Sequence, residues 1–90
     1  MQSVSQAQFF EGMGYKEHAM QYPCGLYICY EGSRGHFFRI DHFDNLYVIE
    51  FADNEKHARM NMFEDCDTFP DDMPPGELIA AIQKSIQEDP

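Results

Sequence analysis

Four histidines and three cysteines are the side chains in this sequence whose types suit metal binding. Zinc ligands usually occur as pairs two to four residues apart, and no such pair is present. His36 and His42 fall on one expected strand, where six residues would separate them by roughly 20 Å. We therefore expect no metal site and no cofactor. The cysteines form an odd set without CxxC spacing, which argues against a disulfide framework.

Catalysis by carboxylates or by a cysteine is the other chemistry that these residue types allow. Sixteen acidic residues in a chain of ninety come close together by chance. Acid–base catalysis needs a cleft that pushes two pKa values apart, and a thin two-layer domain offers little depth for one. No GxSxG, HExxH or phosphate-cradling glycine loop occurs. Cys24 and Cys29 fit the commoner role of small buried hydrophobes. We expect a protein that is not an enzyme.

The charge balance is extreme and unevenly distributed. Six Lys and Arg residues face sixteen Asp and Glu residues, which gives a net charge of −10. Ten of the acidic residues and only two basic ones lie between Asp41 and Asp72, so this segment alone is eight charges negative. Contact with phosphates needs basic side chains, which disfavours direct binding to nucleic acid or to an anionic membrane. A basic protein is the partner that this charge suits.

Length and hydrophobic content set the class of the molecule. With 43% hydrophobic residues, the chain can form a compact fold, and we expect one domain over residues 1–90. No apolar run is long enough to span a bilayer, and the N-terminal residues lack the basic and apolar regions of a signal peptide. A cytoplasmic protein is therefore expected.

The stretch 45–53 is the most strand-like part of the chain and organises the predicted fold. It is rich in β-branched and aromatic residues and has turn residues on both sides. Asp44 and Asn45 both tolerate positive φ, which suits a two-residue type I′ hairpin with the preceding strand. Counting outward from this turn gives the following pairs: His42 with Tyr47, Ile40 with Ile49, Phe38 with Phe51 and, on the opposite face, Arg39 with Glu50.

A second hairpin is expected on the other side of this strand. A turn at 53–56 would pair it with a strand at 57–63, which places Met60 beside Ile49. Arg59 would then meet Glu50, forming an Arg39–Glu50–Arg59 ladder on the charged face. Both hairpins put their apolar residues on the same face, which indicates a meander.

The N-terminal third is expected to supply a helix, a connector and one strand. Ser5 and Gln8 have capping-box spacing, so a short helix is predicted at 6–13, ending at Gly14. Residues 16–24 are interpreted as a connector.

The first strand is predicted at 25–31, and two registers with the next strand remain open. A plain turn at 32–35 would put Tyr27 and Cys29 on the face of Phe38. A glycine bulge at Gly32 or Gly35 would instead put Leu26, Ile28 and Tyr30 there. We favour the bulge.

After the fourth strand, residues 64–76 are interpreted as a long acidic loop with three prolines. Pro75 suits the first turn of a helix at 77–88, whose Leu78, Ile79, Ile82 and Ile86 form an apolar stripe. The predicted fold is α+β: a four-stranded antiparallel β-meander in two layers, flanked by a short N-terminal helix and a C-terminal helix (α-β-β-β-β-α).

The acid run at 64–72 has two interpretations. It can be a solvated loop that only keeps the protein soluble. It can also be a surface for a basic partner, which the nearby aromatic residues favour because aromatic anchors ringed by charge are typical of interfaces. The open sheet face would add an apolar patch of Phe37, Phe43, Leu46, Val48 and Phe63, suited to binding or dimerisation unless the first helix covers it. The predicted partner-binding residues are Asp41, Phe43, Asp44, Asp53, Glu55, Phe63, Glu64, Asp65, Asp67, Phe69, Asp71 and Asp72.

In composition the chain is similar to immunity proteins of secreted nuclease toxins, and equally to phage-encoded anti-restriction and anti-CRISPR inhibitors. This resemblance implies a DNA mimic that blocks a basic, nucleic-acid-handling protein by placing carboxylates where phosphates would sit. The alternative is a non-catalytic adaptor or a homodimer whose acidity only serves solubility.

Overall fold

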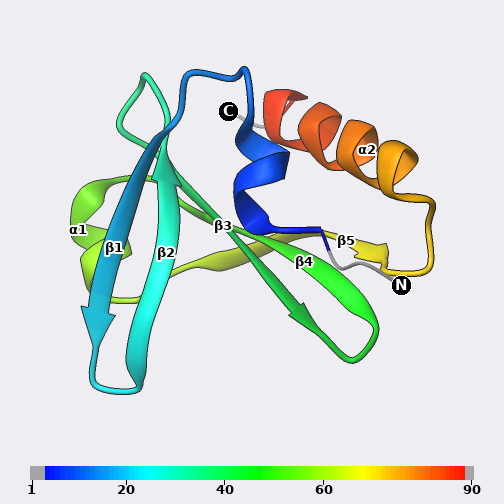
Figure 1. Cartoon of the computed structure of the whole chain (residues 1–90). Coiled ribbons are helices and arrows are strands. Elements are labelled where there is room, and N and C mark those ends of the chain that lie inside the picture. Colours follow the sequence, from blue (N-terminus) through cyan, green and yellow to red (C-terminus); the bar gives the residue numbers. More distant parts are fainter. Residues whose placement is uncertain (1–3, 89–90) are drawn as a thin grey trace.

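The computed structural model describes residues 4–88 and shows an α+β fold. In this part of the chain an antiparallel sheet of five strands, paired in sequence order, is flanked by helices (Figure 1). The elements are the 3-10 helix η1 (Gln6–Phe10), β1 (Lys16–Tyr22), β2 (Gly25–Glu31), β3 (Phe37–Phe43), β4 (Leu46–Ala52), α1 (Glu55–Arg59), β5 (Glu64–Pro70) and α2 (Pro75–Glu88). The meander is confirmed, but it has one strand more than predicted.

The β3–β4 hairpin has the predicted register. Asp44 and Asn45 adopt φ values of 52° and 61°, as a type I′ turn requires. The four predicted pairs all occur, including Arg39 opposite Glu50. Because this turn fixes the register by itself, counting from the sequence was sufficient here.

The predicted strand at 57–63 is wrong. Asn54 caps a helix instead: its side-chain oxygen accepts a hydrogen bond of 2.8 Å from the backbone N–H of His57. The residues that follow Asn54, Glu-Lys-His-Ala-Arg, include good helix formers and no β-branched residue, so a short helix fits them better than a strand. Arg59 consequently pairs with Glu55 at 2.6 Å and takes no part in a ladder with Glu50.

The second strand that pairs with β4 comes from the predicted acidic loop. Residues 64–70 form β5, which pairs antiparallel with β4 and carries an irregularity opposite Ile49 and Glu50. β5 is an edge strand, where one side of the backbone faces solvent. Acidic side chains are compatible with such an edge, which is why composition alone indicated a loop.

The connector predicted at 16–24 is wrong, because polar side chains again concealed an edge strand. Residues 16–22 form β1, which makes seven residue pairs with β2 and is the other edge of the sheet. Its polar first half hides the strand pattern, whereas Met20 and Tyr22 near its end are buried.

The N-terminal helix is shorter than predicted, because 6–10 form a single 3-10 segment. The capping-box spacing is nevertheless used: the backbone N–H of Ser5 donates to Gln8 Oε1 at 2.7 Å. Gly14 has the expected positive φ, 75°.

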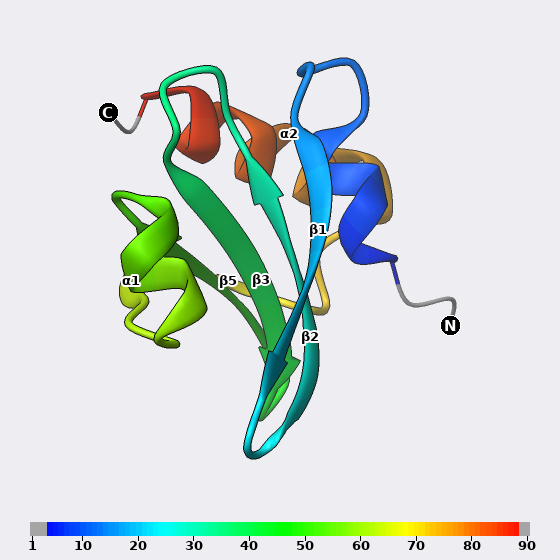
Figure 2. The same ribbon diagram turned by 90° about the vertical axis from the view of Figure 1, so that its left-hand side faces the viewer.

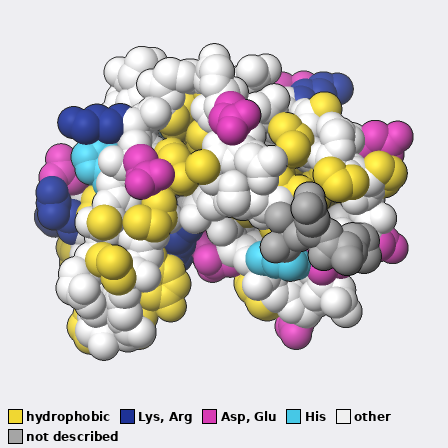
Figure 3. Space-filling view, in the orientation of Figure 1, with side chains coloured by type: hydrophobic (Ala, Val, Ile, Leu, Met, Phe, Trp, Pro, Cys, Tyr) yellow, Lys and Arg dark blue, Asp and Glu magenta, His cyan; other side chains and the backbone are white. Residues whose placement is uncertain are grey.

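β2 and β3 meet only at their ends near the Gly32–His36 loop. Tyr30 pairs with Phe38 and Glu31 with Phe37, and no further pair follows. This register puts Tyr30 on the face of Phe38, as the bulge alternative predicted. Beyond these two pairs the hairpins diverge, and the space-filling view is hollowed between their tips (Figures 1 and 3). Gln6 Oε1 accepts a 2.8 Å hydrogen bond from Ile40 N–H on β3, beyond the last β2–β3 pair.

One sheet face, called here the first face, packs against η1 and α2, whereas α1 lies on the opposite, second face (Figure 2). The predicted stripe of α2 is confirmed, with Leu78, Ile82 and Ile86 buried. The buried residues of the first-face cluster are Phe9, Phe10, Tyr30, Phe38, Ile40, Tyr47, Ile49, Leu78, Ile82 and Ile86.

The second face is not the open apolar surface that the sequence predicted. Phe37 and Val48 are buried, and only Phe43 of the predicted patch is exposed. Arg39 is buried as well, with 7% of its surface exposed. Its guanidinium lies over the rings of Phe63 and Tyr27, at 4.1 and 5.3 Å from their centroids. The buried cluster of this face comprises Met20, Tyr22, Cys29, Phe37, Ala52 and Ala58. With α1 on this face, the layers number three and not two.

Candidate protein-binding surface

The predicted partner-binding residues fall into three groups on the fold. Five lie at or near the tip of the β3–β4 hairpin, two lie at the start of α1, and five lie on β5 or directly before it. In that order the groups are Asp41, Phe43, Asp44, Asp71 and Asp72; Asp53 and Glu55; and Phe63, Glu64, Asp65, Asp67 and Phe69.

The hairpin tip combines an exposed aromatic residue with acidic side chains. Phe43 is 52% exposed beside Asp44. The loop after β5 is tied to this tip, because Asp71 N–H donates to the carbonyl of Asn45 at 3.0 Å. The Asp71 carboxylate also lies 2.8 Å from His42 Nε2. The structure therefore brings Asp71 to the hairpin tip, beside Asn45 and His42, although it is 26 positions away from Asn45 in sequence.

β5 presents its acidic residues along the outer edge of the sheet. Glu64, Asp65 and Asp67 are exposed. Within residues 4–88 no basic side chain forms an ion pair with Glu64 or Asp65. Asp67 accepts a hydrogen bond of 3.1 Å from the hydroxyl of Ser85 on α2. Among the described residues, none of these three acids takes part in an ion pair.

Two of the three predicted aromatic anchors are engaged inside the protein. Phe63 is half-buried beneath Arg39. Phe69 packs against the first-face cluster. Phe43 is left as the exposed aromatic residue among the three.

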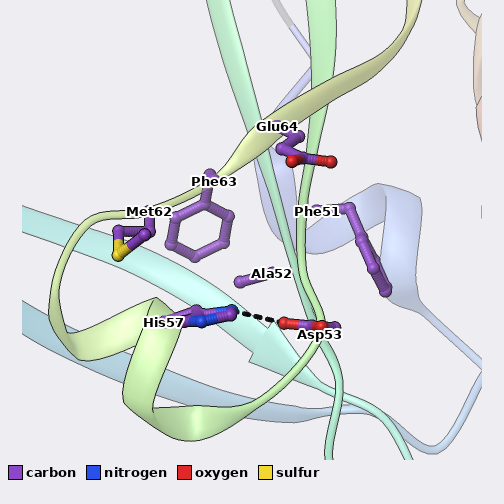
Figure 4. Close-up of a pocket in the computed structure, with 7 residues that line it drawn as sticks. All are labelled: Phe51, Ala52, Asp53, His57, Met62, Phe63 and Glu64. Atoms are coloured by element: carbon purple, nitrogen blue, oxygen red, sulfur yellow. Dashed lines mark hydrogen bonds and ion pairs between the residues drawn. The ribbon is translucent and has the colours of Figure 1, made fainter.

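The acidic residues at the start of α1 have internal partners. Asp53 Oδ1 lies 2.5 Å from His57 Nδ1, and Glu55 pairs with Arg59. Beside them lies a hollow of about 370 Å³ between α1, the end of β4 and the start of β5 (Figure 4). Sequence reasoning did not find this hollow, because it depends on α1 turning His57 back towards Asp53. The signal that could have found it is Asn54, an N-cap residue followed by helix-forming residues.

The ion pair inside the second face is only partly charged near neutral pH. Glu50 Oε1 lies 2.9 Å from Arg39 Nε, and Arg39 Nη1 also donates to Asn61. Burial and a hydrogen bond with Asp41 raise the pKa of Glu50 to about 7, although Arg39 acts in the opposite direction. The negative charge available to a partner is therefore that of the exposed acids and not that of Glu50.

The histidines do not gather into one site. Each has its own polar partner: His18 with Glu31, His36 with Tyr15, His42 with Asp71 and His57 with Asp53. Among residues 4–88, no group of three or more His, Cys, Asp or Glu side chains is arranged to hold a metal ion. Across the same residues, no helix has the length and apolarity that crossing a bilayer requires.

Acidic side chains are visible on both hairpins in the view of Figure 3. The exposed acids of β5 and the hairpin tip form the strongest candidate surface, with Phe43 as its apolar element. Comparisons of this chain with family models, with curated proteins and with solved structures gave no match.

Proposed function

We propose that this protein binds a basic, nucleic-acid-handling protein and blocks it by presenting carboxylates where phosphates would otherwise lie. The binding surface consists of Glu64, Asp65 and Asp67 on β5 together with Phe43 and Asp44 at the hairpin tip.

The observation that carries this proposal is the contrast between matched and unmatched acids. Glu55 has a basic partner within the chain, and Asp53 has a histidine. Glu64 and Asp65 have no ion-pair partner among the described residues. Side chains of an extended strand alternate in direction, so acids that point the same way along β5 lie roughly 6.6 Å or more apart. Asp65 pairs with Glu50 and Asp67 with Ile49, so the acids of β5 present negative charge on both sides of the sheet edge, where a basic groove that receives the edge can contact them.

Protection of the sheet edge is the simpler explanation for charge on β5. Charged residues, an irregular register and a terminal proline all discourage edge strands from pairing with other chains. This explanation does not extend to Asp44 or Asp72, which lie in the hairpin turn and in the loop after β5. Charge that continues beyond the edge favours a binding surface.

The test is a salt-resolved binding measurement on the partner recovered from the protein's own host. Immobilised protein captures the partner, which is then eluted with rising salt and, separately, with duplex DNA. Complementary charge and phosphate mimicry predict elution by both. The variant E64Q/D65N/D67N should bind at least about tenfold more weakly, because three charge contacts of about 0.5 kcal/mol each are lost.

The matched control is E11Q/E17Q/E77Q, which changes the net charge equally but away from the proposed surface. It should retain the affinity of the wild type. An equal loss of affinity in both triple variants would show that net charge, and not the proposed surface, determines binding. Binding that is insensitive to salt and to duplex DNA would overturn the proposal, as would a concentration-dependent dimer that buries β5.

A further inference from the structure

The hollow beside α1 joins an aromatic ring to two carboxylates. Phe63 lies on one side, with Ala52 at its base (Figure 4). Glu64 lies at one end, and the Asp53–His57 pair lies at the other. Asp53 and Glu64 are exposed, and no Lys or Arg lines the cavity. A cation with a flat surface is the ligand that complements such a lining.

The protein already holds one arginine in equivalent surroundings. Arg39 lies over the ring of Phe63 and makes its ion pair with Glu50. An aromatic ring and a carboxylate thus bind a guanidinium inside this fold. Phe63 also lines the hollow, whereas Arg39 does not, so the hollow offers this ring together with solvent access and the exposed carboxylates of Asp53 and Glu64.

We propose that this hollow receives an arginine side chain of the basic partner. The inference rests on the proposed function and specifies the partner's anchoring residue. A guanidinium suits the site better than an ammonium, because its planar group can stack on Phe63 while its five N–H donors reach more than one acceptor. Glu64 supplies one acceptor.

The Asp53–His57 pair supplies the other end of the site. In the tautomer whose Nδ1–H donates to Asp53, Nε2 of the His57 ring is a further acceptor. Met62, an exposed and flexible side chain at the rim, can adjust to the aliphatic part of an incoming arginine.

The probe is Nα-acetyl-arginine N-methylamide, titrated into the isotope-labelled protein and followed by amide chemical shifts. The citrulline analogue has nearly the same shape without the charge and is the matched ligand control. Shift changes at Ala52, His57 and Phe63 are expected for the arginine compound, with an affinity at least tenfold above that of the citrulline compound. Equal binding of the two compounds, or shifts confined to other elements, would overturn the inference.

Two variants probe the carboxylates, and one serves as their control. D53N removes the charge of Asp53 but keeps an oxygen acceptor for His57. E64Q removes the charge of Glu64 at the other end of the hollow. Each should weaken arginine binding at least threefold. E55Q removes an equal charge from α1 at a residue that does not line the hollow, and it should leave binding unchanged. A loss in E55Q equal to that in E64Q would show that only net charge matters.

The captured partner separates this inference from the proposed function. If D53N binds the partner as tightly as the wild type, and binding remains salt-sensitive, the arginine anchor is wrong while the proposed function stands. If the wild type retains no salt-sensitive partner, both fail, even where the arginine compound binds the hollow. Partner affinity that falls in D53N but not in E55Q supports both.

Discussion

The two faces of the sheet are shielded from water in different ways. The first face is covered by the fourteen-residue helix α2 and by η1, whose aromatic and aliphatic side chains form its core. The second face is covered at one end by α1, only five residues long. Arg39 helps to cover the rest by lying over Phe63 and Tyr27. A long side chain can cover apolar surface while its charge is matched locally. Stability is therefore concentrated on the first face, and ionisable groups on the second.

The largest expected effect is on the first face. Ile82→Ala removes a fully buried side chain from α2 and should lower the free energy of unfolding by about 2–5 kcal/mol. Ala58→Gly, the second-face counterpart on α1, should cost about 1 kcal/mol, which is the difference in helix propensity. Urea unfolding of both variants measures the two losses in the free energy of unfolding. Equal losses would contradict the assignment of stability to the first face.

A smaller effect is expected from Glu50 and should depend on pH. Its pKa in the folded protein, about 7, is raised above the usual 4.5. The folded state therefore holds this proton more tightly than the unfolded state does. The stabilisation is complete below about pH 4.5 and is lost as the pH rises through 7.

Glu50→Gln imitates the protonated form and removes this loss. From pH 5 to pH 8, the stability of E50Q relative to the wild type should rise by about 2.5 kcal/mol. Thermal or urea unfolding at several pH values gives the difference curve. A flat difference between the two proteins would mean that Glu50 is ionised throughout, as a simple ion pair with Arg39 would be.

The smallest effect is expected where η1 meets β3. Gln6→Ala leaves the N–H of Ile40 without its acceptor and should cost about 1 kcal/mol. Gln83→Ala, which affects a hydrogen bond to Glu11 on an exposed surface, should cost less. Urea unfolding measures both losses. If Gln83→Ala cost more than Gln6→Ala, the hydrogen bond between Ile40 N–H and Gln6 would not be the more stabilising of the two.

Sequence reasoning succeeded where local chemistry determines the structure. Asp44-Asn45 fixed the β3–β4 register, and the apolar stripe identified α2. It failed at both edge strands, because β1 and β5 satisfy only half of their backbone groups within the sheet and tolerate polar side chains. Lys16 and Glu17 suggested a connector, and the acids of β5 suggested a loop.

The candidate surface was predictable in part. The acids of β5 were identified from charge alone, and their exposure is confirmed. The packing of Arg39 on Phe63 could not be predicted in this way. It requires Phe63 to follow α1, whereas the prediction placed Phe63 at the end of a strand. The hollow depends on the same helix, so the wrong strand at 57–63 concealed both features.

The short seam between β2 and β3 has a geometric consequence. Seven residue pairs join β1 to β2 and seven join β3 to β4, but two pairs join the halves to each other. The halves are thus two ribbons meeting at a hinge near the Gly32–His36 loop. The distance between Leu26 at one ribbon's end and Phe43 at the other's is set by that hinge and not by a continuous ladder.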